Sequence, residues 1–115
     1  MLTDYKNATA RFKALGHPVR LQILDMLRSG EVCVCHMETA LGKRQAYISQ
    51  QLMVLRDAGL VESRRDGLSV FYRVIDDVIF DVLEAALGPL TDEEPDALES
   101  CPCPHCAEDV SEVVS

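Results

Sequence analysis

The fold of this 115-residue chain is decided at residues 48–74, which read I-S-Q-Q-L-M-V-L-R-D-A-G-L-V-E-S-R-R-D-G-L-S-V-F-Y-R-V. In the first half, Ile48, Leu52 and Leu55 recur at the spacing that places side chains on one face of a helix. Gly59 follows, and glycine is the residue that most often ends a helix. The first half therefore predicts an amphipathic helix with a polar outer face.

The second half of this stretch predicts a β-hairpin. Two β-prone runs, 60–65 and 68–74, flank the pair Asp66-Gly67. An Asp-Gly pair between two such runs is a strong signal for a two-residue hairpin loop. Arg64 and Arg65 lie next to that loop, so the tip of the hairpin is expected to be basic.

A short helix is predicted just before the amphipathic one. Met37, Ala40 and Leu41 follow helical spacing, Gly42 is placed to end that helix, and Lys-Arg-Gln at 43–45 is expected to form a turn. Two helices joined by about three residues, the second polar on its outer face, are typical of a helix-turn-helix. With the hairpin behind it, the pattern predicts a winged helix-turn-helix.

Three more helices are expected around this unit. Apolar residues at helical spacing mark residues 2–15 and 78–87, and an almost wholly apolar run at 19–27 predicts a buried helix that starts at Pro18. Gly16 is placed to end the first of them. The fold class predicted is therefore mainly α with a small β-hairpin.

The charge is distributed unevenly along the chain. Its formal net charge is −8, but eight of its 19 acids lie within residues 92–115, where there is no Lys or Arg. Residues 1–91 are therefore neutral, and 43–73 carry six bases against three acids. We expect a domain over 1–90 and an acidic, cysteine-containing tail over 91–115 that begins with a linker. A surface that faces DNA remains compatible with this balance.

The sequence also argues for a cytoplasmic protein. It has no apolar run of about 18 residues for a membrane span, and its polar N-terminus lacks the core of a signal peptide. Thiols stay reduced in the cytoplasm, and clustered cysteines there more often bind metal or sense redox state than form structural disulfides. No Gly-rich nucleotide motif or phosphate-binding Cys loop is present, and no C-x-x-C pair is placed to open a thioredoxin-like helix, so we expect no enzyme and no small-molecule substrate.

All five cysteines fall in two clusters, E-V-C-V-C at 31–35 and C-P-C-P-H-C at 101–106. On an extended segment, Cys33 and Cys35 would point to the same side, and the start of the following helix would favour their thiolate forms. The tail cysteines Cys101, Cys103 and Cys106 have no packing reason to be there, and their spacing is typical of metal ligands.

Three separate stretches, 16–24 (G-H-P-V-R-L-Q-I-L), 31–35 and 48–74, make the chain resemble the ArsR/SmtB family of metal-sensing repressors over roughly residues 5–88. The resemblance implies a homodimer of winged-helix subunits whose first and last helices form the interface. It also implies binding to double-stranded operator DNA in the metal-free state and release of DNA when metal binds.

The resemblance makes the helix over 48–58 the recognition helix, whose N-terminal end would enter a major groove. Lys43 and Arg44 would lie where phosphates pass, and Arg64 and Arg65 would contact phosphate or minor groove. Base contacts are expected from the polar positions at the start of that helix. The candidate DNA-binding residues are Lys43, Arg44, Gln45, Tyr47, Ser49, Gln50, Gln51, Arg64 and Arg65.

Two thiolates are too few ligands for a thiophilic ion, which takes three or four. The arsenic-sensing branch of the family often adds a third cysteine at the position of Glu38, so here we expect the tail to supply the rest, within one subunit or across the dimer. Three thiolates suit As(III), Sb(III) or Pb(II), and four suit Cd(II) or Zn(II). Such a tie would couple ion binding to the orientation of the helix over 48–58. The candidate metal ligands are Cys33, Cys35, Cys101, Cys103 and Cys106.

Other roles for these groups were weighed. His36 and His105 are expected to be bystanders, His17 to be structural, and the zinc site that the family builds on its last helix to be absent because residues 77–88 contain no histidine. The alternative function is a repressor of the same fold that senses redox state or persulfide through its thiols.

Overall fold

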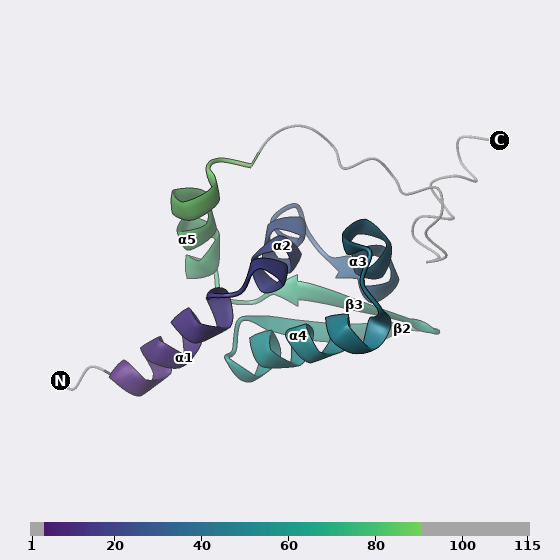
Figure 1. Cartoon of the computed structure of the whole chain (residues 1–115), viewed down its shortest axis with the longest axis horizontal. Coiled ribbons are helices and arrows are strands. Elements are labelled where there is room, and N and C mark those ends of the chain that lie inside the picture. Colours follow the sequence, from purple (N-terminus) through teal and green to yellow (C-terminus); the bar gives the residue numbers. More distant parts are fainter. Residues whose placement is uncertain (1–3, 91–115) are drawn as a thin grey trace.

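The computed structural model describes residues 4–90, which fold into five helices and a three-stranded antiparallel sheet (Figure 1). The elements are, in chain order, α1 (Tyr5–Leu15), α2 (Pro18–Leu27), β1 (Val32–Cys33), α3 (Val34–Leu41), α4 (Gln45–Asp57), β2 (Val61–Asp66), β3 (Ser69–Val74) and α5 (Val78–Leu87). The mainly α prediction with a helix-turn-helix and a wing is confirmed. The tail over 91–115 lies outside the described residues.

The helix-turn-helix consists of α3 and α4. Gly42 ends α3 in the left-handed conformation, at φ 62° and ψ 34°, and its N–H donates to the carbonyl of Glu38. Arg44 is the extended residue before α4, which begins at Gln45. The prediction that Gln45 belongs to the turn is wrong by one residue, because the chain already takes up helical geometry there.

The core lies where α2, α3, α4 and α5 meet the base of the sheet. Ile48, Leu52 and Leu55 of α4 are fully buried, as their spacing predicted, and they pack with Met37 of α3 and Leu83 of α5 in one cluster. Burying a side chain of this size stabilises the fold by about 1.5–3 kcal/mol. The inner face of the amphipathic α4 is therefore fixed, and its polar faces are directed to the surface.

The sheet contains one strand that the sequence did not predict. β1 pairs antiparallel with β3, with Val32 opposite Tyr72 and Cys33 opposite Phe71, so the strand order is β1-β3-β2. A two-residue strand has no periodicity of its own, and its partner lies far along the chain. This pairing joins the Cys-x-Cys segment directly to the wing.

The wing is the hairpin of β2 and β3. Its end pair is Asp66 with Ser69, so the loop consists of Gly67 and Leu68 and not of the predicted Asp66-Gly67. Gly67 has φ 62°, a left-handed conformation that glycine adopts without strain. Leu68 at the tip is fully exposed.

The two outer helices leave apolar side chains in solvent. Figure 1 shows α1 projecting from the rest of the fold, and its Tyr5 and Phe12 are 76% and 69% exposed. The end of α5 is tied to α2, because the Arg28 guanidinium donates to the Gly88 carbonyl at 2.7 Å. No helix among residues 4–90 combines the length and the apolar character needed to cross a bilayer.

Candidate nucleic-acid interface and thiol pair

Cys33 and Cys35 lie where β1 turns into α3. Cys33 is the extended residue before the helix, at φ −81° and ψ 153°, and its Sγ accepts from the His36 N–H at 3.3 Å. Cys35 is already the second residue of α3. The prediction that both cysteines share an extended segment is therefore wrong, but the turn brings their Sγ atoms to 2.7 Å from each other.

The thiol pair has one buried and one accessible member. Cys33 is buried, whereas Cys35 is half-buried. Both residues stand at the start of α3, where the Cys33 Sγ accepts from a backbone N–H. Two thiolates on one side of a turn fit as part of the ligand set of a thiophilic ion.

The described part of one subunit does not hold a complete ligand set for such an ion. Among residues 4–90 no three His, Cys, Asp or Glu side chains form a group that could hold a metal ion. The predicted ligands Cys101, Cys103 and Cys106 lie outside the described residues, as does His105. The structure therefore brings two of the five predicted ligands together, and metal binding by any of the five stays a prediction.

A second cluster connects the Cys-x-Cys segment with the wing. Glu31 binds the Arg64 guanidinium through two hydrogen bonds, of 2.6 and 3.1 Å, and Arg64 also lies 4.9 Å from the centre of the Phe71 ring. The hydrogen bond with Glu31 raises the pKa of Arg64 above its usual value, so the guanidinium stays charged. Arg64 was predicted to contact DNA, but in this structure it is held by Glu31.

The polar surface of α4 has three distinct flanks. At about 100° per residue, Gln45 and Ser49 lie on the flank that faces the wing, and Gln50 lies opposite the buried side. Gln51 and Tyr47 lie on the remaining flank and are half-buried. The predicted base-contacting residues therefore do not share one face.

Two predicted phosphate contacts, Lys43 and Arg44, lie exposed just before α4. The Lys43 ammonium is 5.9 Å from the centre of the Tyr47 ring. Both cations are therefore on the side of the helix-turn-helix where α4 begins, which agrees with the arrangement that the sequence predicted.

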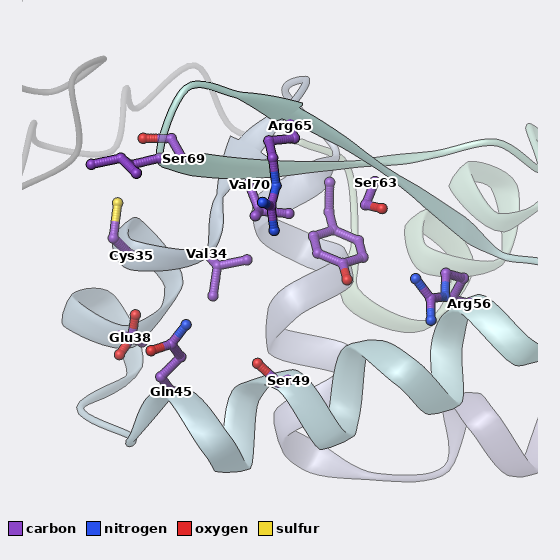
Figure 2. A pocket seen from close by; sticks show the side chains of 12 residues that line it. Val34, Cys35, Glu38, Gln45, Ser49, Arg56, Ser63, Arg65, Ser69 and Val70 are labelled. Atoms are coloured by element: carbon purple, nitrogen blue, oxygen red, sulfur yellow. The ribbon is translucent and has the colours of Figure 1, made fainter.

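An open cleft of about 630 Å³ separates α4 from the wing (Figure 2). Cys35 lines one end of it, beside Glu38 and Gln45, and Arg65 reaches into it from the wing. The structure thus brings Gln45, Ser49, Arg65 and Cys35 to one cleft and leaves Arg64 outside its lining.

Sequence reasoning missed Arg56, which lines the cleft near the C-terminal end of α4. The signal was available, because Gln45, Ser49 and Arg56 are separated by four and seven residues, which places them on one flank of a helix. In contrast, the structural interpretation of His17 is confirmed. Its Nδ1 accepts from the Val19 N–H at 3.2 Å and caps α2.

Comparison with known proteins agrees with this architecture. Residues 17–63 match the family model described as bacterial regulatory protein, arsR family. Over 84 residues the chain is 40% identical to the uncharacterised HTH-type transcriptional regulator MJ1325 of Methanocaldococcus jannaschii, which covers 72% of this chain and 94% of the relative. The chain belongs to the ArsR family.

Other relatives of this ArsR-family chain carry more specific names. The biofilm growth-associated repressor of Agrobacterium fabrum is 44% identical over 73 residues, 64% of this chain and 62% of the repressor. The homodimeric winged helix-turn-helix DNA-binding domain Mb0332 of Mycobacterium bovis is 33% identical, with a TM-score of 0.66 over 74% of this chain and 83% of that domain. The antimony-specific repressor AntR is 32% identical, with a TM-score of 0.64 over 71% and 75%.

Membership of the family settles the class of protein. The family consists of transcriptional regulators that bind DNA with a winged helix-turn-helix, so the chain is a regulator of the repressor type and not an enzyme, as the sequence predicted. The family membership does not name the signal to which this chain responds.

Proposed function

We propose that this ArsR-family chain is a homodimeric, cytoplasmic repressor that binds operator DNA when metal-free and releases it when thiolates coordinate a thiophilic ion. The observation that carries the proposal is the pair of Sγ atoms of Cys33 and Cys35, 2.7 Å apart, at the start of the helix-turn-helix. The signal site and the DNA-reading unit are in that case parts of one short segment.

The exposed polar surface of α4 supports the DNA-binding part. Gln50 is exposed on the outward flank of α4, and glutamine can form a bidentate pair with adenine in a major groove. Lys43 and Arg44 lie exposed beside the start of the helix, where cations would neutralise phosphates. Of the residues predicted to contact DNA, Arg64 is the one with its charge already satisfied by a carboxylate.

The apolar outer faces of α1 and α5 support the homodimer. Phe12 of α1 is 69% exposed, and Val78 and Leu87 of α5 are 60% and 46% exposed. Phe12 and Val78 line one hollow between the two helices, and apolar side chains exposed together on a single subunit are typical of an interaction surface. The relative Mb0332 is named as a homodimeric domain of the same fold.

The chemistry of sulfur supports a thiophilic ion as the effector. Cys33 and Cys35 would supply two thiolates, and the tail cysteines Cys101, Cys103 and Cys106 would supply one or two more. Soft thiolate ligands select ions such as As(III), Sb(III), Cd(II), Pb(II) or Zn(II). A related structure is named as an antimony-specific repressor, so a metalloid is a natural member of the test panel.

Titration of the protein–DNA complex with each of these ions under reducing conditions tests the proposal. The DNA would be a duplex selected from a random pool for binding to the protein. We expect at least one thiophilic ion to release it, and we expect Cys33→Ser to abolish release without loss of DNA binding. If none of the five ions releases the DNA, the metal-sensing part of the proposal is wrong.

The same 2.7 Å separation favours a second candidate function, redox sensing. In that case Cys33 and Cys35 lose two protons and two electrons to form a disulfide, while an oxidant such as hydrogen peroxide is reduced to water. The mass of the protein would fall by about 2 Da per bridge. Release of DNA by peroxide, reversed by a thiol reductant, together with no response to any ion, would favour this function over metal sensing.

A further inference from the structure

The cleft between α4 and the wing has cations on both of its walls. On α4, Arg56 lies on the same flank as Ser49, and on the wing Ser63 and Arg65 alternate along β2 so that both face the cleft. Figure 2 shows Arg65 reaching in from the wing and Arg56 from the opposite wall near the end of α4. Two guanidinium groups and two hydroxyls therefore converge on one space from two different elements.

The arginines of the wing differ in what neutralises them. Arg64 is held by Glu31 at 2.6 Å, and Arg73 forms an ion pair with Glu62. Within the described range 4–90, neither Arg65 nor Arg56 forms an ion pair with a carboxylate. The cleft therefore contains the two arginines near the wing whose charge is available to an external anion.

The acidic residue of the cleft lies away from these arginines. Glu38 lines the end formed by α3, beside Cys35 and Gln45, while Arg56 lies at the other end (Figure 2). An anion is attracted to the basic end and repelled from the acidic one, so the charge pattern places it between α4 and the middle of the wing. Ser49 and Ser63 provide hydroxyl donors there.

We propose that this cleft holds one backbone strand of duplex DNA, with Arg56 and Arg65 binding its phosphates from opposite walls. The inference rests on the DNA binding proposed above and assigns the phosphate contacts to particular residues. When α4 reads a major groove and the wing lies over the neighbouring minor groove, the strand that separates the two grooves passes between them. Arginine is suited to this role because its planar guanidinium binds phosphate with two hydrogen bonds.

The same placement relates the thiol pair to the DNA. Cys35 lines the cleft that the strand would occupy, so whatever binds the thiol pair lies next to the phosphates. An ion bound at the thiol pair would therefore lie in the same cleft as the DNA strand, at its α3 end.

Salt dependence of DNA affinity tests the assignment. Arg56→Gln and Arg65→Gln are compared with Arg73→Gln, all at exposed positions, on a selected duplex and on a random-sequence duplex from about 50 to 200 mM salt. Each of the first two is expected to reduce the slope of log affinity against log salt by about 0.9, equally on both duplexes. The Arg73→Gln control is expected to keep the wild-type slope.

Three further outcomes complete the test. Arg56→Lys and Arg65→Lys keep the charge, so they are expected to keep the slope. Wild-type slopes for both Arg56→Gln and Arg65→Gln would overturn the assignment and leave the proposed DNA binding intact. Failure of the wild-type protein to bind either duplex would overturn both. Thermal unfolding of each variant checks that the fold is retained.

Discussion

Cys33 combines a structural role with the proposed chemical one. Its Sγ accepts the His36 N–H and so caps α3, whereas Cys35 lies inside the helix as its second residue. Serine is a favoured capping residue and alanine is not. We expect Cys33→Ala to lower the free energy of unfolding by about 1 kcal/mol relative to Cys33→Ser, as measured by urea denaturation.

The matched control for this prediction is Cys35. Cys35→Ala and Cys35→Ser are expected to be equally stable to within about 0.5 kcal/mol, because Cys35 lies inside α3 and not at its N-cap position. All four variants are expected to lose the response to ions. Equal stability of Cys33→Ala and Cys33→Ser would mean that the sulfur does not cap the helix.

Gln50 and Gln51 are neighbours in the sequence but lie on different flanks of α4. Gln50 lies on the outward flank of α4 and is exposed, while Gln51 is half-buried on the flank away from the wing. We expect Gln50→Ala to weaken binding to the selected duplex about tenfold or more, through loss of a base contact, and Gln51→Ala to change it less than about twofold. Binding to a random-sequence duplex should change little in either variant. The reverse order of effects would contradict this assignment of the outward face.

At the scale of elements, the short strand β1 connects the thiol pair to the wing. Cys33 is paired with Phe71 in the sheet, and Glu31 holds Arg64 against the Phe71 ring. A change at the thiol pair is therefore expected to reach β3 through the sheet as well as α4 through α3. The sequence-based hypothesis considered α4 alone.

The Glu31–Arg64 pair provides a prediction about this connection. Removing the carboxylate with Glu31→Gln frees a guanidinium at the wing, so we expect DNA affinity at low salt to rise and the salt slope to steepen by about 0.9. The double variant Glu31→Gln/Arg64→Gln should return to the wild-type slope. Measurement by fluorescence anisotropy on a random-sequence duplex is sufficient. An unchanged slope in Glu31→Gln would mean that Arg64 cannot reach the DNA even when it is free.

The elements differed in how far sequence could predict them. The amphipathic α4 and the hairpin of β2 and β3 were predictable, because each has its own periodicity and a glycine at its boundary. β1 was not, since a two-residue strand is defined only by its distant partner. The predicted hairpin loop lies one residue too early in the sequence. Asp66 still pairs with Ser69, and Gly67, with its positive φ, is the first residue of the loop.

Only those parts of the candidate site that are local in the sequence were predictable. The cysteine pair and the polar start of α4 are local patterns, so they could be found from spacing. Ion pairs between distant positions are not local, and nothing in the sequence indicates that Glu31 neutralises Arg64 while Arg65 stays available. The roles of the two adjacent arginines therefore became distinct only in three dimensions.

At the scale of the whole molecule, α1 and α5 expose large apolar side chains at different places from the cleft between α4 and the wing. Tyr5, Phe12 and Val78 are exposed on the two outer helices, among polar neighbours, whereas the cleft is lined by polar and charged groups of α4 and β2. In a dimer joined through α1 and α5, two copies of α4 could contact successive major grooves of a two-fold symmetric site. A variant that cannot dimerise should then bind DNA more weakly.

Phe12 provides the test of that linkage. It is 69% exposed and lines a hollow of about 250 Å³ between α1 and α5, so a charge at this position would disrupt packing between subunits without entering the subunit core. We expect Phe12→Asp to be a monomer in sedimentation equilibrium and to bind the selected duplex at least about 100-fold more weakly, because the second half-site no longer adds avidity.

The matched control is Leu68→Asp, which places the same charge at the fully exposed tip of the wing. Because Leu68 is not on α1 or α5, this variant is expected to remain dimeric, and any loss of DNA affinity would come from the wing alone. A dimeric Phe12→Asp would contradict the assignment of the interface to α1. A monomeric Phe12→Asp with wild-type affinity would show instead that one subunit is enough to bind the DNA, since no second half-site would then be contributing.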